Sequence, residues 1–308
     1  MRILITGATG FLGRPLTENL CAQGHEVTAL VRHPPSAQAL LPQAVRLQAW
    51  RAGHTLAAGF IASADYEAVI HLAGASIGQW PWNSRRRRLL WDSRVAATET
   101  LIGDLAGQKV FPRLWINASG MGYHGDAGNR RVTEDGPCGG DFLAGLAKAW
   151  EDAALSARGH GARVICLRFG MILDRDGGAL PAMAKPFRLG LGARLGSGRQ
   201  GQPWIHREDA IGLILFALRE DSPFPALTGP VHAVAPTTPS QAAFAEALAR
   251  EFKRPLLFRA PAWALRLSLG RFADLLLHGQ YGEPAKAQAA GYVFRFGDAP
   301  SALRDIFA

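Results

Sequence analysis

The sequence predicts an α/β fold, a doubly wound parallel sheet with helices on both faces and a smaller C-terminal cap. Short β-branched or apolar runs alternate with longer amphipathic stretches through the first half, which is typical of parallel strands joined by crossover helices. The chain has 308 residues, 48% of them hydrophobic, which is enough for one large core or for a major and a minor domain.

The first half is expected to contain six strands and three helices. The strands are Arg2 to Thr6, His25 to Val31, Val45 to Gln48, Ala68 to Leu72, Arg113 to Ala118 and Arg163 to Leu167. The helices, whose apolar residues recur at helical spacing, are Phe11 to Gln23, Ser84 to Ala106 and Asp141 to Arg158. Gly24 can adopt the left-handed conformation that ends the first of these helices.

The pattern changes after Gly170. Glycines recur between Gly177 and Gly201 in a stretch rich in arginine, which indicates a functional loop and not a domain linker. Further on we expect a helix, a buried strand and a second helix, over Glu208 to Leu218, Val231 to Ala235 and Pro239 to Glu251. The rest of the chain reads as helices broken by proline and glycine, which suits a small cap on the carboxyl ends of the strands.

A glycine-rich turn follows the first strand. Gly7, Gly10 and Gly13 are spaced GxxGxxG, and the helix that Phe11 opens comes directly after the turn. The first glycine permits a tight turn, the second lets a phosphate approach the backbone, and the third lets the helix pack closely on the sheet. Backbone amides at a helix N-terminus bind anions, so the turn predicts a Rossmann-type site for the pyrophosphate of a dinucleotide.

The end of the second strand indicates which dinucleotide binds. NAD-binding chains usually place a carboxylate there, about 20 residues beyond the glycines, where it accepts hydrogen bonds from the ribose. Here Arg32 and His33 follow Val31. A guanidinium pairs with a 2′-phosphate, which a carboxylate would repel, so Arg32 favours NADP; the alternative is an ordinary solvated arginine.

These observations predict the domain organisation. We expect residues 1–170 to form an NAD(P)-binding Rossmann domain, to which residues 204–235 return. Residues 171–308 are expected to be mainly substrate-binding.

The composition indicates which classes of partner the protein could bind. The formal net charge of +9 suits an anionic partner such as a dinucleotide, a nucleotide sugar or nucleic acid. Nucleic acid is the weakest of these, because no helix-turn-helix, stacking platform or zinc pattern accompanies the charge. The run Arg85 to Arg88 follows Asn83 and Ser84, which can cap a helix, so its side chains are expected to point around a mostly solvated helix start.

Metal sites and membranes are not indicated either. The three cysteines, Cys21, Cys138 and Cys166, lack the spacing of a zinc site and the even count of a disulfide framework, so no metal is expected. The first strand begins at Arg2, without room for a signal peptide, and no apolar run reaches membrane-spanning length. We therefore expect a cytoplasmic monomer or homodimer that acts on a small-molecule substrate.

Further segments carry a resemblance to a known family. They are His71 to Gly74, Asp92 to Arg94, Ser119 to Gly125, Gly177 to Leu180, Pro186 to Gly192, Gly196 to Gln200 and Trp204 to His206. Together with the glycine turn they resemble the extended short-chain dehydrogenase/reductase superfamily of NAD-dependent epimerases and dehydratases, and more narrowly its atypical branch of epimerase family proteins. The resemblance covers essentially the whole chain and implies oxidoreductase or epimerase-like chemistry.

The resemblance also implies roles for individual residues. The pyrophosphate would be held by Gly7, Thr9, Gly10, Phe11 and Leu12. The adenosine and ribose would be lined by Leu72, Ala73 and Gly74, and the nicotinamide would be flanked by Gly170, Met171 and Ile172. Arg94 would face the cofactor from the long helix. Ser119 matches the serine that contacts the reacting group; the alternative is a strand-end serine bonded to its own backbone.

One departure from the family's pattern bears on the chemistry. The superfamily's catalytic pair is Tyr-x-x-x-Lys, in which the lysine lowers the pKa of the tyrosine. No tyrosine here is followed by a lysine four places later, and matching the helix on Glu151 puts Leu143 and Ala147 at the two positions. Lys148 is one residue out of register, about 100° around the helix, so it cannot simply substitute.

Other polar residues are candidates for the site. Tyr123 and His124 are the nearest replacements as proton donors, or else pocket walls that only position a ligand. Arg188 and Arg199 lie in the loop expected to cover the substrate, which suits an anionic ligand group unless they are simply solvated. His206 is a further candidate substrate residue. It precedes a helix together with Asp209, so a capping role competes with a role in binding.

Two functions from different classes remain open. An NADP-dependent oxidoreductase or epimerase-like enzyme would place Ser119, Tyr123 and the loop from Gly177 to Gly201 around the nicotinamide. A non-catalytic NADP-binding sensor or scaffold would keep the binding half without the Tyr/Lys pair. Turnover that is lost in Tyr123→Phe or Ser119→Ala would separate the first from the second.

Overall fold

A seven-stranded parallel sheet forms the centre of the protein, in a computed structural model that describes residues 1–56, 65–107, 111–219 and 226–308. The strand order is β12-β7-β5-β4-β1-β2-β3. The strands are β1 Arg2–Thr6, β2 Glu26–Val31, β3 Arg46–Ala49, β4 Ala68–His71, β5 Leu114–Gly120, β7 Arg163–Phe169 and β12 Gly229–Ala233. The chain builds outward from β1 to one edge and then from β4 to the other, so the strand order reverses between β1 and β4, where ligands of such sheets bind.

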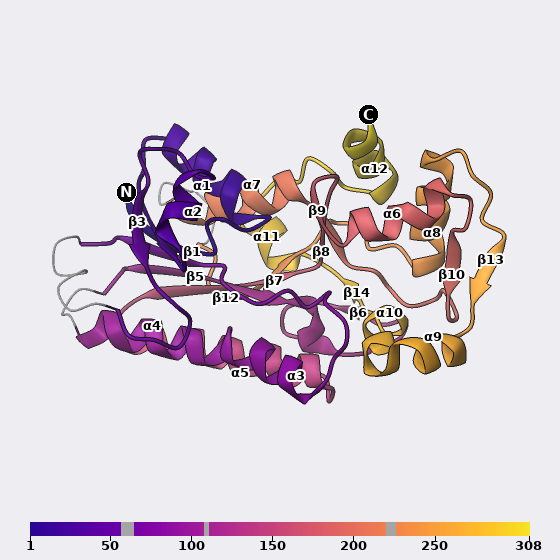
Figure 1. Cartoon of the computed structure of the whole chain (residues 1–308), viewed down its shortest axis with the longest axis horizontal. Coiled ribbons are helices and arrows are strands. Elements are labelled where there is room, and N and C mark those ends of the chain that lie inside the picture. Colours follow the sequence, from indigo (N-terminus) through magenta and orange to yellow (C-terminus); the bar gives the residue numbers. More distant parts are fainter. Residues whose placement is uncertain (57–64, 108–110, 220–225) are drawn as a thin grey trace.

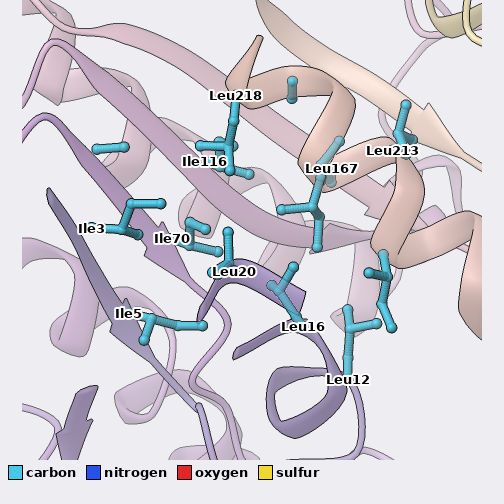
Figure 2. Close-up of a cluster of buried hydrophobic side chains, with 14 of the residues drawn as sticks. Ile3, Ile5, Leu12, Leu16, Leu20, Ile70, Ile116, Leu167, Leu213 and Leu218 are labelled. Carbon is cyan, nitrogen blue, oxygen red and sulfur yellow. The ribbon is translucent and has the colours of Figure 1, made fainter. Parts of the chain in front are cut away.

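Helices cover both faces of this sheet (Figure 1). One face carries α1 Gly13–Ala22, α2 Pro34–Gln38, α7 Arg207–Leu218 and α11 Ala285–Ala289, and the other carries α3 Ser84–Asp92, α4 Val95–Gly107 and α5 Phe142–Leu155. Figure 2 shows leucines of α1 and α7 packed on apolar side chains of the central strands, among them Leu16, Leu20, Leu213, Ile3, Ile70 and Ile116. The apolar core therefore fixes the glycine turn at the start of α1 against the sheet.

The remaining elements gather beyond the carboxyl ends of the central strands (Figure 1). Three small sheets join β11 Trp204–His206 to β8 Met171–Asp174 and β9 Gly177–Gly178, β10 Ala193–Leu195 to β13 Phe258–Ala260, and β14 Tyr281–Gly282 to β6 Arg131–Val132. The helices there are α6 Leu180–Arg188, α8 Gln241–Glu251, α9 Ala262–Leu269, α10 Asp274–Leu277 and α12 Ala299–Phe307, with 3-10 turns η2 Met121–His124 and η4 Gly270–Ala273. A further 3-10 turn, η3 Ser156–His160, joins α5 to the amino end of β7.

The six predicted strands of the first half all form, and Gly24 ends α1 with a φ of 80° as expected. The single helix expected from Ser84 to Ala106 is wrong, because α3 ends at Asp92 and α4 begins at Val95. The Ser93 hydroxyl at the junction donates to the Leu90 carbonyl oxygen and accepts from the Ala75 amide. These side-chain bonds compete with continued helix, and the contact to Ala75 comes from a distant segment.

Other helices and strands also begin or end at different residues than predicted. Helix α1 begins at Gly13 and not at Phe11, because residues 7–12 form a turn in which the Gly10 amide donates to the Gly7 carbonyl oxygen at 2.9 Å. The last strand of the central sheet ends at Ala233 and not at Ala235. Within residues 204–235, α7 packs on the central sheet and β12 is its edge strand, whereas β11 pairs with β8 outside that sheet. The C-terminal part, expected to be helical, also contains β13 and β14.

The arginine run opens α3 as expected. The Asn83 side chain caps the helix by accepting from the Arg86 amide at 2.8 Å. Arg85 and Arg88 are exposed, whereas Arg86 donates to the Ser76 carbonyl oxygen and Arg87 lies 4.2 Å from the centroid of the Phe142 ring. Within the described part of the chain, no helix combines the length and the apolar character that a bilayer-spanning segment needs.

Candidate functional site

The glycine turn brings three segments into contact at the carboxyl edge of the sheet. Gly7 has a φ of 72°, and a Cβ there would lie 2.9 Å from the backbone carbon of Leu72, just after β4. A Cβ on Gly13 would overlap the Gly7 carbonyl oxygen, so α1 approaches the strand end more closely than any other residue would permit. Leu12, at the N-cap of α1, makes no side-chain capping hydrogen bond. The amides of the first helical turn therefore have no side-chain acceptor there and can donate to an anion.

A buried polar contact holds the segment after β4 in place. The Thr6 hydroxyl lies 2.8 Å from Nδ1 of His71 and accepts from the Ala73 amide at 3.1 Å. Burial lowers the pKa of His71 to about 3, so this imidazole is neutral at neutral pH. The contact ties the ends of β1 and β4 together beneath the turn.

Arg94 supports the same segment from the junction of α3 and α4. The residue is 7% exposed, and its guanidinium donates to the Ala75 carbonyl oxygen at 2.9 Å and to the Leu90 carbonyl oxygen at 3.3 Å. A Cβ on Gly74 would lie 3.1 Å from Cζ of Arg94, so the glycine makes room for the guanidinium. Burial lowers the pKa of Arg94 to about 10, which leaves it charged at neutral pH.

The glycine pair of β9 packs on the glycine turn. A Cβ on Gly177 would lie 2.5 Å from Cδ2 of Phe11, and one on Gly178 would lie 3.0 Å from Cε1 of the same ring. Gly170 is equally constrained, because a Cβ there would lie 2.7 Å from the backbone of Pro203. β9 therefore meets the glycine turn at the aromatic ring of Phe11, and a Cβ on Gly178 would also lie 2.8 Å from the Ile172 carbonyl oxygen.

Arg32 stands exposed directly after β2. Among the described residues, none forms a hydrogen bond or an ion pair with its side chain. His33 is also exposed and makes no side-chain hydrogen bond at the N-cap of α2. The end of β2 thus presents positive charge where NAD-binding chains place a carboxylate.

A buried ion pair lies behind Ser119, at the carboxyl end of β5. The Ser119 hydroxyl donates to Oε1 of Glu151 on α5 at 2.6 Å. Arg168 on β7 donates from Nε to Oε1 and from Nη2 to Oε2 of the same carboxylate, both at 2.8 Å. The side chains of Glu151 and Arg168 are 3% and 2% exposed, so this bidentate pair is shielded from water. The Ser119 hydroxyl therefore bonds to a side chain of α5 and not to its own backbone, which was the alternative expectation.

Tyr123 and His124 on η2 lie beside this pair. Cζ of Arg168 is 3.5 Å from the centroid of the Tyr123 ring, and its Nη1 is 3.3 Å from Nε2 of His124. Nε2 of His124 in turn lies 2.9 Å from Nε2 of His232 on β12. Burial lowers the pKa of His124, and lowers that of His232 to about 3.

The helix positions that match the Tyr/Lys pair carry apolar side chains. Leu143 packs close to Gly122, whose Cβ would lie 3.2 Å from that of Leu143. Ala147 is buried. Lys148 points into solvent, where its Nζ lies 2.5 Å from Oδ2 of Asp152.

The three candidate substrate residues of the cap lie apart from Ser119. Cζ of Arg188 is 5.2 Å and 5.5 Å from the ring centroids of Phe252 and Phe307, on the side of α8 and α12. Arg199 is exposed, and its carbonyl oxygen accepts from the Tyr281 hydroxyl. His206 caps α7 by accepting from the Glu208 amide at 3.1 Å. Within the described part of the chain, no hydrogen bond or ring contact joins any of the three to Ser119, Tyr123 or His124.

Three residues that contact Ser119, Tyr123 or His124 were not predicted from the sequence. They are Glu151, Arg168 and His232. A signal for the first was present, because Glu151 continues the apolar stripe of Ala144 and Ala147 on α5 and so had to be buried. Arg168 and His232 belong to β7 and β12 and are buried there among apolar neighbours. A charged residue in a buried strand requires a partner, but the sequence does not say which one.

Comparison with known proteins places this geometry in a family. The profile of the NAD dependent epimerase/dehydratase family matches residues 3–226, and a domain of unknown function, DUF1731, matches residues 260–306. An epimerase family protein of Mycobacterium leprae is 36% identical over 305 residues, which cover 98% of this chain and 94% of that protein.

Solved structures agree with this assignment. The crystal structure of the human epimerase family protein SDR39U1 with NADPH matches with a TM-score of 0.85 and 32% identity, covering 100% of this chain and 99% of that one. A crystal structure of UDP-galactose 4-epimerase matches with a TM-score of 0.76 and 17% identity over 100% of this chain and 97% of its own, which shows a common fold alone. This chain therefore belongs to the NAD dependent epimerase/dehydratase family, among the extended short-chain dehydrogenases/reductases.

Proposed function

We propose that this protein is an NADPH-binding enzyme of the oxidoreductase or epimerase-like type, which acts on a small molecule at the carboxyl edge of its sheet. The observation that carries the proposal is Arg32, exposed and unpaired among the described residues at the end of β2, the strand next to the one that leads into the glycine turn. The similarity to human SDR39U1, solved with NADPH, supports the choice of NADP over NAD.

The residues present fit such a cofactor. The backbone amides that follow Gly10 would hold the pyrophosphate, at the close approach of α1 to the turn that a Cβ on Gly13 would prevent. Arg32 would pair with the 2′-phosphate, and the segments 72–74 and 170–172 would line the rest of the cofactor. When bound, the nicotinamide would accept or donate the hydride.

Ser119 and Glu151 would move the proton. The Ser119 hydrogen is directed at Glu151, so the lone pairs of Oγ remain to accept a hydrogen bond from a substrate hydroxyl. As the substrate O–H bond breaks and its proton passes to Oγ, the original Ser119 proton passes to Oε1 of Glu151. Arg168 balances the charge of the carboxylate before the transfer. This relay would replace the Tyr/Lys pair, with Tyr123 as the neighbouring alternative donor.

Nucleotide affinities test the cofactor assignment. By calorimetry we expect NADPH to bind about 10- to 100-fold more tightly than NADH, the difference that a charge-assisted hydrogen bond contributes. Arg32→Glu should remove that preference. The control is Arg46→Glu, the same charge change at the amino end of β3, which should leave both affinities unchanged. Equal affinities of the wild-type protein for both nucleotides would overturn the NADP assignment.

A second candidate function, a non-catalytic NADPH-binding sensor or scaffold, is favoured by Leu143 and Ala147 at the positions of the missing pair. A screen of NADPH oxidation against sugars, quinones and other carbonyl compounds separates the two. Turnover that is lost in Ser119→Ala or Tyr123→Phe supports the enzyme, whereas tight binding of NADPH without turnover supports the sensor.

A further inference from the structure

Two buried histidines face each other behind Tyr123. His124 belongs to η2 and His232 to β12, and their side chains are 5% and 0% exposed. Their Nε2 atoms lie 2.9 Å apart, with ring planes at 85°. Two nitrogens at this distance form a hydrogen bond only when one of them carries a proton.

The other nitrogen of each ring is already committed. Nδ1 of His124 lies 3.0 Å from the Pro137 carbonyl oxygen, and Nδ1 of His232 lies 2.9 Å from the Glu283 carbonyl oxygen. A carbonyl oxygen only accepts hydrogen bonds, so both Nδ1 atoms must carry hydrogen. A neutral imidazole has a single N–H. With both rings neutral, Nε2 of His124 would accept only from Nη1 of Arg168, 3.3 Å away, and its lone pair would face that of Nε2 of His232, which would then have no donor among the described residues.

We propose that His124 and His232 share one proton between their Nε2 atoms, so that the pair is a buried monocation that positions Tyr123. The proton completes the hydrogen bonds of both rings. It joins η2, which carries Tyr123, to β12 and, through the Glu283 carbonyl oxygen, to the segment that leads into α11. The pair lies outside the relay of Ser119 and Glu151 and is independent of which cofactor binds.

The charges around the pair support a single positive charge. Arg168 compensates Glu151 in a bidentate pair, whereas Oε1 of buried Glu134 accepts only from backbone amides, those of His232 and Lys286, both at 3.1 Å. In the part of the chain that the structure describes, no side-chain cation is paired with Glu134. The ammonium of Lys286 lies 3.5 Å from Asp135 instead. A proton on the histidine pair supplies the missing positive charge.

The same surroundings exclude a second proton. Burial lowers the pKa of both rings, and each ring is also repelled by Arg168, whose Nη1 lies 3.3 Å from Nε2 of His124. Repulsion from His124 and from Lys286 lowers the pKa of His232 further. The groups that face the pair are therefore Arg168 on β7, Glu151 on α5, Tyr123 on η2, Lys286 on α11 and Glu134 between β6 and α5. These groups allow at most one proton on the pair.

Nitrogen NMR of the full chain, labelled with ¹⁵N at histidine and free of nucleotide, tests the proposal. At about pH 7 we expect one of the nine histidines to show two protonated ring nitrogens, protected from solvent, and to lose this signal in His232→Gln. Buried His71 is the internal reference and should show a single protonated nitrogen. Two singly protonated rings at positions 124 and 232 would overturn the proposal. Because no nucleotide is present, the result does not depend on NADPH binding.

A charge substitution gives a second readout. Glu134→Gln keeps the size of the side chain and removes its negative charge, so the pH at which the pair loses its proton should fall by about one unit or more. Asp135→Asn is the matched control, because it changes the neighbouring carboxylate, whose side chain is 86% exposed, and should leave that pH unchanged. An unshifted midpoint in Glu134→Gln, or an equal shift in both variants, would contradict the role of Glu134 as counter-charge.

Discussion

The Ser119 hydroxyl donates a 2.6 Å hydrogen bond to Oε1 of Glu151, which lies one helical turn beyond Ala147 on α5. Ala147 occupies the lysine position of the Tyr-x-x-x-Lys pattern. Arg168 from β7 supplies the counter-charge of Glu151. Ser119 thus contacts a carboxylate that is shielded from water together with its guanidinium partner.

Removing the serine hydroxyl should affect turnover more than cofactor affinity. With a substrate found by the screen, Ser119→Ala is expected to lower kcat by about 10²- to 10⁴-fold, the usual contribution of a positioned proton-transfer group. The NADPH dissociation constant should stay unchanged, because the proposed pyrophosphate site lies at Gly7 to Gly13. Steady-state kinetics and calorimetry measure the two quantities. Full turnover in this variant would rule out the relay.

Lys148 provides the matching negative control. Its ammonium is exposed and pairs with Asp152 on the solvent side of α5, away from Ser119. Lys148→Ala should leave kcat unchanged and should hardly alter the free energy of unfolding, as for other exposed ion pairs. A large loss of kcat in Lys148→Ala would show instead that this lysine has taken over the missing role.

The buried ion pair should be costly to break from one side. Arg168→Met leaves Glu151 buried without its cation, and we expect the free energy of unfolding to fall by about 3–5 kcal/mol. The double variant Glu151→Leu/Arg168→Met should be less destabilised than the sum of the single changes, because neither charge is then left alone. Denaturant unfolding of the four proteins measures the coupling. Additive effects would show that the two side chains do not depend on each other.

The close approach of α1 to the turn depends on Gly13. In Gly13→Ala the new methyl group would overlap the Gly7 carbonyl oxygen, so the helix must shift and the amides must leave their positions. We expect NADPH binding to fall at least about 10-fold, together with a lower melting temperature. Gly103→Ala in the middle of α4 is the control, because a Cβ there meets nothing within 4 Å. It should bind normally and be slightly stabilised.

Acid should destabilise the protein partly through His71. Its pKa is about 3 in the folded state and about 6.5 in the unfolded state, so between these values only the unfolded chain binds the proton. Stability from this group is complete above about pH 6.5 and falls by about 1.4 kcal/mol per pH unit as the pH decreases towards 3. Chemical unfolding at several pH values measures the slope. His71→Gln should reduce the slope by that amount, whereas His33→Gln at an exposed position should not.

The amino-acid sequence by itself determined the six strands of the first half, the glycine turn and its position before α1. Each of these depends on short-range patterns: apolar runs with a period, and glycines at fixed spacing next to a strand. The position of Arg32 just after β2 followed from the same local reasoning, because only the preceding strand had to be identified.

Only the tertiary structure decided which polar side chains meet. Ser119, Glu151, Arg168 and His232 come from β5, α5, β7 and β12, and the order of these strands in the sheet brings them to one edge. The same cause broke the predicted helix at Ser93, whose hydroxyl bonds to the Ala75 amide from another segment. A buried charge or hydroxyl must find a partner, but the folded backbone chooses that partner, and no local pattern in the sequence records the choice.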